Sequence, residues 1–111
     1  MSDIVDVTTI RHLNDQLRQS LAGGVLVMTA GVIALGPARQ LTILHAVAKF
    51  DSFHKDDDPY GEHDFGALEV EGECLFWKID YYDRNLSAHS PDPADPSVTT
   101  RVLTIMLADE Y

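Results

Sequence analysis

Residues 68–82 alternate between apolar and polar positions, and this alternation constrains the fold more than any other feature of the chain. Apolar residues occupy positions 68 and 70 and then every second position from 75 to 81. Side chains of a strand point alternately to opposite faces, so each row predicts a strand with one buried face. A two-residue turn at Gly72-Glu73 would join the two strands into a β-hairpin over about 65–82. The predicted register pairs Val70 with Leu75, Leu68 with Trp77, Asp64 with Tyr81, and His63 with Tyr82.

Helical spacing and turn residues predict the elements that precede this hairpin. A first helix covers about residues 8–21, where apolar residues recur at helical spacing and Gly23-Gly24 provides the stop. A second helix begins at Pro37, a favoured first helical residue, and runs to about Phe50. The apolar pieces within residues 25–35 predict a bent strand or a tight hairpin between the two helices.

The segment 98–110 has two interpretations. Its apolar residues repeat at helical spacing behind Asp95, a favoured cap, and Pro96, which favours a terminal helix. Threonines at positions 99, 100 and 104 keep a strand as the alternative. We therefore predict a single α+β domain over residues 1–111 with the order α-β-α-β-β-α, an antiparallel sheet, and helices packed on one face. Residues 1–12 could form a loosely ordered N-terminal extension.

Acidic residues are concentrated in one region of the chain. Residues 51–95 contain thirteen acidic and three basic residues, so this segment alone carries the net charge of −10. Such a field repels phosphate backbones and anionic membranes and attracts basic protein surfaces. We therefore expect neither direct nucleic-acid binding nor membrane attachment. The single cysteine, Cys74, cannot form an intrachain disulfide, and the apolar runs are too short to span a bilayer, so a cytoplasmic location is expected.

Three polar residues lead directly into the hairpin, namely Glu62, His63 and Asp64. Imidazole and carboxylate groups suit transition metals, so His63, Asp64 and Asp80 form one alternative, a metal or acid–base site. Adjacent strand residues point to opposite faces, which separates His63 from Asp64 and argues against convergence. The competing interpretation is structural, with Glu62 and Asp64 accepting backbone hydrogen bonds that hold the loop. We predict no bound metal and no cofactor.

Phe76 and Tyr82 lie in the outward row of the second hairpin strand, beside Lys78 and Asp80. Either a helix or the proline-containing segment 85–95 covers this face, or the face binds a partner through aromatic anchors with an acidic rim. The second alternative accounts for the aromatic residues and the regional charge together. The predicted interaction surface consists of Asp56, Asp57, Asp58, Glu62, Phe76, Lys78, Asp80, Tyr82 and Asp83.

Four motifs, in this order, resemble those of a known family. They are GEHDFG at 61–66, FWKIDYYD at 76–83, SPDPADP at 90–96 and TRVLTIMLADEY at 100–111. The family is the domain-of-unknown-function family 3768 of alphaproteobacterial chromosomes and plasmids, and the resemblance covers roughly residues 13–111. It implies a bacterial protein in a mobile-element setting, where small acidic proteins often act on host defence or DNA-handling proteins. It implies no activity and no catalytic residues.

The sequence favours a non-enzymatic protein-interaction module that binds a basic partner surface. The first alternative is a small metal-dependent enzyme or metal-binding protein that uses His63, Asp64 and Asp80. The second alternative is that the acidic face serves only to keep the protein in solution. Self-association into a homo-oligomer is compatible with each of these hypotheses.

Overall fold

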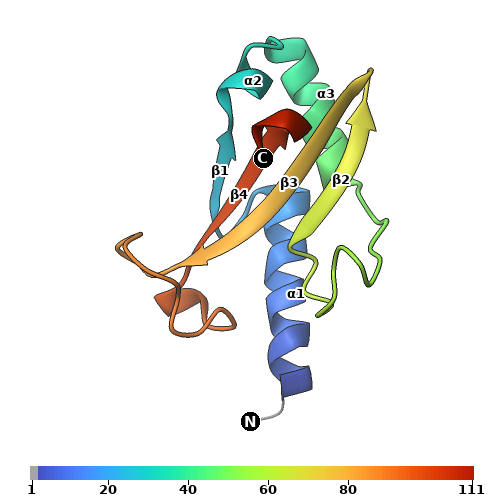
Figure 1. The fold of residues 1–111 in the computed structure, drawn as a ribbon. Coiled ribbons are helices and arrows are strands. Elements are labelled where there is room, and N and C mark those ends of the chain that lie inside the picture. Colours follow the sequence, from blue (N-terminus) through green and yellow to red (C-terminus); the bar gives the residue numbers. More distant parts are fainter. Residues whose placement is uncertain (1–2) are drawn as a thin grey trace.

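The computed structural model describes residues 3–111, which form a four-stranded sheet with helices on one side (Figure 1). The strands lie in the order β1-β4-β3-β2. β1 is parallel to β4, whereas β4 with β3 and β3 with β2 are antiparallel. The elements are α1 (Asp3–Ser20), β1 (Val25–Met28), α2 (Ala30–Ile33), α3 (Pro37–Ala48), β2 (Phe65–Val70), β3 (Glu73–Tyr82), the 3-10 turn η1 (Pro96–Val98), β4 (Thr100–Leu107) and the 3-10 turn η2 (Ala108–Glu110).

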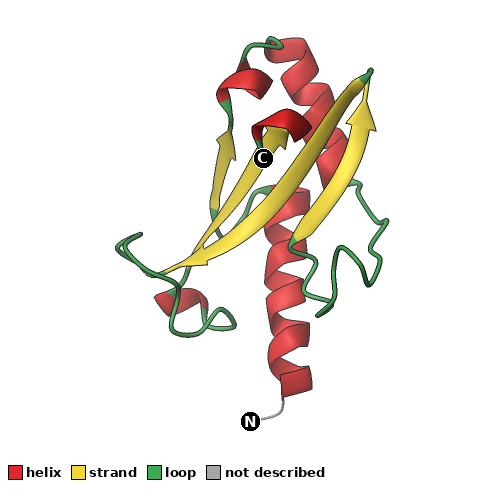
Figure 2. Ribbon diagram, viewed as in Figure 1, coloured by secondary structure: helices red, strands yellow, loops and turns green. Residues whose placement is uncertain are grey.

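One hydrophobic core fills the space between the sheet and the helices α1 and α3 (Figure 2). The inward rows of β3 and β4 meet the apolar sides of the helices there, and Trp77 is fully buried at the centre. The buried core residues are Leu17, Val32, Ile43, Val47, Val70, Leu75, Trp77, Ile79, Leu103 and Ile105. The predicted α+β class is therefore confirmed, and the chain forms a compact domain. No helix within residues 3–111 combines the length and the apolar character needed to cross a bilayer.

The hairpin forms as predicted, but its turn lies one residue earlier. Val70 pairs with Glu73 rather than with Leu75, so the turn consists of Glu71 and Gly72. Both residues have positive φ, 51° and 85°, the combination that a type I′ hairpin turn requires. The change shifts every cross-strand pair by two residues, which preserves the faces and changes the partners. Accordingly, the amide of Ile79, and not a group of Tyr81, donates to the backbone oxygen of Asp64 (2.8 Å).

The predicted terminal helix over 98–110 is wrong, because residues Thr100–Leu107 form strand β4. β4 lies between β1 and β3 and carries apolar side chains on both faces, with Leu103 and Ile105 on the core face and Val102 and Met106 on the other. Apolar residues on both faces of a central strand imitate helical spacing, which explains the error. The sheet is consequently mixed rather than antiparallel. Asp95 does cap the expected start, since its carboxylate accepts from the amide of Ser97 at 2.9 Å, but only the short turn η1 follows.

Residues 30–33 form helix α2, where the second part of a bent strand or of a tight hairpin was predicted. The start of α2 is held by Glu110, whose carboxylate accepts hydrogen bonds from the Thr29 hydroxyl (2.6 Å) and the Gly31 amide (2.9 Å). This stabilisation comes from a residue far away in the sequence, so local patterns could not reveal it. Helices α1 and α3 lie close to their predicted ranges, although α1 begins at Asp3. The suggested extension over 1–12 falls partly on residues 1 and 2, outside the described residues.

The sheet face opposite the helices remains largely uncovered within residues 3–111 (Figure 1). The segment 85–95 does not cover this face, and its residue Ser90 instead donates a backbone hydrogen bond to Tyr81 at the end of β3 (3.0 Å). Tyr111 crosses part of this face, where its ring packs edge-on against Phe65 and Phe76 with centroid distances of 6.1 and 5.4 Å. Tyr82 on the same face is 36 % exposed. This face therefore offers polar and aromatic side chains to the outside.

Candidate functional site

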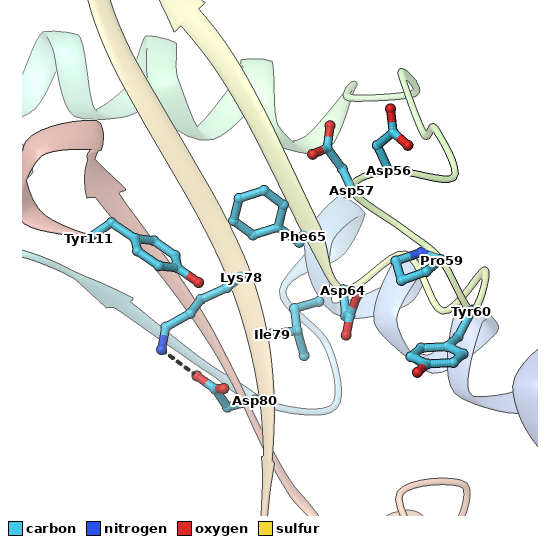
Figure 3. Close-up of a pocket in the computed structure, with 10 residues that line it drawn as sticks. All are labelled: Asp56, Asp57, Pro59, Tyr60, Asp64, Phe65, Lys78, Ile79, Asp80 and Tyr111. Carbon is cyan, nitrogen blue, oxygen red and sulfur yellow. Dashed lines mark ion pairs between the residues drawn. The ribbon is translucent and has the colours of Figure 1, made fainter.

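A cavity of about 410 Å³ lies where the loop before β2 meets β3 and the C-terminal residue Tyr111 (Figure 3). The loop contributes one wall, β3 contributes the floor, and Tyr111 approaches from the opposite side. The cavity lies beside the uncovered face, at the end of the sheet where β2 begins at Phe65 and β3 continues beyond Lys78 without it. Its lining residues are Asp56, Asp57, Pro59, Tyr60, Asp64, Phe65, Lys78, Ile79, Asp80 and Tyr111.

Negative charge dominates this lining. Four of the ten residues are aspartates and only Lys78 is basic. The Lys78 ammonium lies 3.1 Å from the Asp80 carboxylate, and this hydrogen bond raises the pKa of Lys78. Lys78 therefore offsets the charge of Asp80 and leaves the other three carboxylates of the cavity without a basic partner among its lining residues.

Asp64 is the carboxylate that this environment affects most. Burial, followed by the negative charges of Glu62 and Asp58, raises its pKa from the ordinary 3.8 to about 6. Asp80 adds a smaller effect in the same direction. At neutral pH Asp64 is thus ionised at a free-energy cost to the folded protein, and a positively charged group bound nearby would reduce that cost.

Replacing Asp64 with asparagine should stabilise the protein at neutral pH. Below the ordinary pKa both folded and unfolded chains hold the proton, so this group contributes nothing. As pH rises from 3.8 to about 6, the unfolded chain releases its proton first and the stability of the folded protein falls. The stabilisation by D64N should therefore be complete above that window. Because Asp64 is only half-buried, solvent screening reduces it to on the order of 1 kcal/mol.

Urea unfolding of the wild type and D64N at about pH 8 and about pH 4 measures this effect, which should be largely lost at the lower pH. Asp57→Asn is the matched control, because Asp57 lines the same cavity but is exposed. An equal gain for D64N at both pH values, or a loss at the higher one, would contradict the assignment.

His63 is not among the lining residues of the cavity and instead joins the loop to helix α1. Its Nδ1 lies 2.9 Å from a carboxylate oxygen of Asp15, and its Nε2 lies 3.8 Å from Asp58. The imidazole also stacks flat on Phe53, with a centroid distance of 3.7 Å and an interplanar angle of 3°. The ring is therefore held by a hydrogen bond with Asp15 on one edge and by an aromatic ring on its face, which is a structural role.

Asp58 and Glu62, two residues of the predicted interaction surface, are turned toward the protein. Asp58 is 7 % exposed, and its carboxylate accepts a hydrogen bond from the backbone amide of His63 (3.0 Å). The Glu62 carboxylate accepts a hydrogen bond from the Tyr81 hydroxyl (2.8 Å). Neither residue lines the cavity, but the negative charges of both act on Asp64. Their hydrogen bonds to His63 and Tyr81 hold the loop in place.

A buried polar network that the sequence patterns did not reveal supports this loop from α1. Asn14 is fully buried and donates to the backbone oxygen of Glu62 (3.0 Å) and to the Tyr81 hydroxyl (2.8 Å), and it accepts from Arg101 Nε (2.9 Å). Arg101 also donates to the carbonyl of Pro93. Burial raises the pKa of Tyr81 and lowers that of Arg101. The sequence does contain one sign of this network. Asn14 and Arg101 are polar residues at buried positions that otherwise hold apolar residues, on α1 and on β4 respectively.

The remaining predicted surface residues lie around the cavity or along β3. Asp56, Asp57, Lys78 and Asp80 line the cavity itself. Phe76 borders it through its contact with Phe65, at a centroid distance of 5.4 Å. Tyr82 and Asp83 lie further along the strand, and the Asp83 carboxylate accepts hydrogen bonds from the amides of Asn85 and Ser87.

The alternative metal site does not assemble from its three proposed residues. Asp64 and Asp80 both line the cavity, whereas His63 is engaged by Asp15 and Asp58. Among residues 3–111, no three histidine, cysteine, aspartate or glutamate side chains are grouped so that they could hold a metal ion. The arrangement therefore offers carboxylates and aromatic rings to a ligand.

Among the comparisons with known proteins, the one with protein families finds a match, and this match covers most of the chain. No curated protein and no solved structure matches the chain. A protein-family model matches residues 28–110, which is well over half of the chain. The matched range runs from the last residue of β1 through β4 and includes every lining residue of the cavity except Tyr111. It begins after α1, later than the resemblance over 13–111 suggested. The chain therefore belongs to the family described as protein of unknown function DUF3768.

Proposed function

We propose that this protein is a non-enzymatic interaction module that binds a basic surface of another protein. The observation that carries the proposal is the acidic and aromatic cavity beside the uncovered sheet face. Its two outermost aspartates, Asp56 and Asp57, are exposed and sit at the rim. Exposed acidic groups around aromatic rings complement a basic surface, since charge speeds the encounter and the rings supply contact area.

The proposed contact surface differs slightly from the surface predicted from the sequence. Asp58 and Glu62 are left out, because their side chains do not line the cavity and instead hold the loop through hydrogen bonds to His63 and Tyr81. Tyr60 and Tyr111 join the surface, because both line the cavity and are largely exposed. The proposed contact residues are Asp56, Asp57, Tyr60, Phe76, Lys78, Asp80, Tyr82, Asp83 and Tyr111.

Basic surfaces are typical of proteins that bind nucleic acids. We therefore propose DNA-handling or defence proteins of a bacterial host cytoplasm as the first partners to test, in keeping with a role on mobile elements. The acidic surface would occupy the basic site of such a protein and block or modulate it. The opposed charges support this choice, because the segment that lines the cavity carries the whole net charge of −10.

Crosslinked capture from bacterial extract should recover proteins with basic surfaces, and the recovery should depend on salt and on two rim residues. Raising salt from about 50 to about 300 mM shortens the distance over which charges act and should reduce recovery several-fold. The double substitution D56N/D57N should have a similar effect because it removes two exposed charges from the rim.

The matched control is E69Q/E71Q, which removes the same charge from two exposed positions on the hairpin outside the cavity lining. This control should retain most of the recovery. A recovered set that is indifferent to salt and equally affected by both double variants would overturn the proposal. The acidic residues would then serve only to keep the protein in solution.

A further inference from the structure

The chemistry of the cavity allows the proposed function to be specified further, because aromatic rings and carboxylates converge there. Tyr60 and Tyr111 are 76 % and 75 % exposed, which is more than any other large apolar or aromatic side chain among the described residues. Both belong to the same cavity, although they are far apart in the sequence. Two aromatic rings left open to water on opposite sides of one cavity provide faces on which a flat group can stack.

The carboxylates at the base of the cavity select a positive charge. Asp64 forms no ion pair with any described residue, and it lies between Tyr60 and β3 in Figure 3. Asp80 is already paired with the Lys78 ammonium at 3.1 Å. A second ammonium would have to compete with Lys78, whereas a group with several donors can bind Asp64 and still share Asp80.

An arginine side chain fits these features better than the other common cations. Its guanidinium is planar, weakly hydrated and rich in donors, so it stacks on aromatic rings and binds carboxylates through two parallel hydrogen bonds. A lysine ammonium is compact and strongly hydrated, and it gains less from stacking. A volume of about 410 Å³ accommodates a guanidinium together with part of its aliphatic chain and a neighbouring residue.

We propose that the cavity receives an arginine side chain of the partner protein, stacked on Tyr60 and hydrogen-bonded to Asp64, with Tyr111 at the opposite side of the cavity. This inference rests on the proposed function and names the residue through which the basic partner is recognised. The exposed aspartates at the rim, Asp56 and Asp57, attract the partner, and the cavity then distinguishes arginine from lysine.

Titration of the labelled protein by NMR with three capped Gly-Ser peptides tests this inference. The peptides carry arginine, lysine or uncharged citrulline at the same positions. The arginine peptide should shift the amide signals of Tyr60, Asp64, Lys78 and Tyr111 and should bind about fivefold more tightly than the lysine peptide. The citrulline peptide should cause no shift at millimolar concentration.

Three variants locate the binding. D64N should weaken the arginine peptide about tenfold, and Y60A should weaken it about fivefold and reduce the preference over lysine. E69Q removes one negative charge from an exposed residue outside the cavity lining and should change the affinity less than about twofold. Neither D64N nor Y60A should prevent folding, because asparagine relieves an ionised group and Tyr60 is exposed.

The results separate this inference from the proposed function. Equal binding of the arginine and lysine peptides, or equal effects of D64N and E69Q, would overturn the arginine site. The proposed function would still stand if D56N/D57N reduced the capture of a basic protein. If no peptide binds at millimolar concentration, the arginine site is rejected as well, and the capture experiment alone decides on the interaction module.

Discussion

Replacing Arg18 with methionine should lower the free energy of unfolding by roughly 3 kcal/mol. Arg18 is 2 % exposed, and its Nη1 donates to the carbonyl oxygens of Val47, Ala48 and Phe50 at 2.9–3.0 Å. These carbonyls lie at the end of α3, where no further helical turn can supply donors. Removing the guanidinium takes this donor from all three carbonyls, although that of Val47 still accepts from the Phe50 amide (3.2 Å). It also deprives Asp15 of its ion pair (3.1 Å).

Two further variants show whether the arrangement of donors, rather than charge, is responsible. Arg18→Lys keeps the charge and loses the planar group that lies over Phe53 and Trp77, so its stability should be intermediate. Arg11→Met is the matched control, because Arg11 also belongs to α1 but donates to a single carbonyl, that of Gly61. It should cost about 1 kcal/mol in urea unfolding. Wild-type stability of R18K would show that charge alone matters.

Introducing a single methyl group at Gly66 should destabilise the protein by about 3 kcal/mol. A Cβ at this position would lie 2.7 Å from Cε2 of Trp77 and 2.8 Å from Cε1 of Phe50, and it would also meet the indole nitrogen. Both rings belong to the packed core, and Trp77 has no exposed surface. The rings therefore cannot yield without disturbing their neighbours.

Gly72→Ala is the matched control for the change at Gly66. No atom lies within 4 Å of a Cβ at Gly72, but its φ of +85° disfavours any other residue, so the cost should be about 1 kcal/mol. Trp77 is the single tryptophan of the chain, so its fluorescence reports the disturbance directly. G66A should change the emission spectrum of the folded protein and G72A should leave it unchanged. Equal costs for both variants, with unchanged emission, would contradict the crowding at Gly66.

The sequence predicted the faces of the hairpin correctly and its pairing incorrectly, and both outcomes have the same cause. Moving the turn from Gly72-Glu73 to Glu71-Gly72 changes the pairing by two residues, and side chains repeat with a period of two. Leu75, Trp77 and Ile79 therefore remain inward in either register. Gly72 belongs to both possible two-residue turns, and glycine is acceptable at its position in each of them. The local sequence therefore could not distinguish the two turns.

The candidate site was predictable where it depends on local sequence and not where it depends on tertiary contacts. The concentration of acidic residues in 51–95 indicated a negative surface, and Asp56, Asp57 and Asp80 do line the cavity. The contribution of Tyr111 follows from the position of β4 in the sheet, which was predicted as a helix. The exposure of Tyr60 likewise depends on how the loop is fixed, and no spacing pattern encodes it.

The central position of β4 has a consequence for how the chain acquires its structure during synthesis. β1 and the β2–β3 hairpin are made first, but β4 lies between them and pairs with both. Until residues 100–107 have left the ribosome, the sheet consists of two unconnected pieces with open edges. Folding of the sheet should therefore be delayed until β4 has been synthesised. A nascent chain stalled before β4 should remain sensitive to proteases and depend on chaperones.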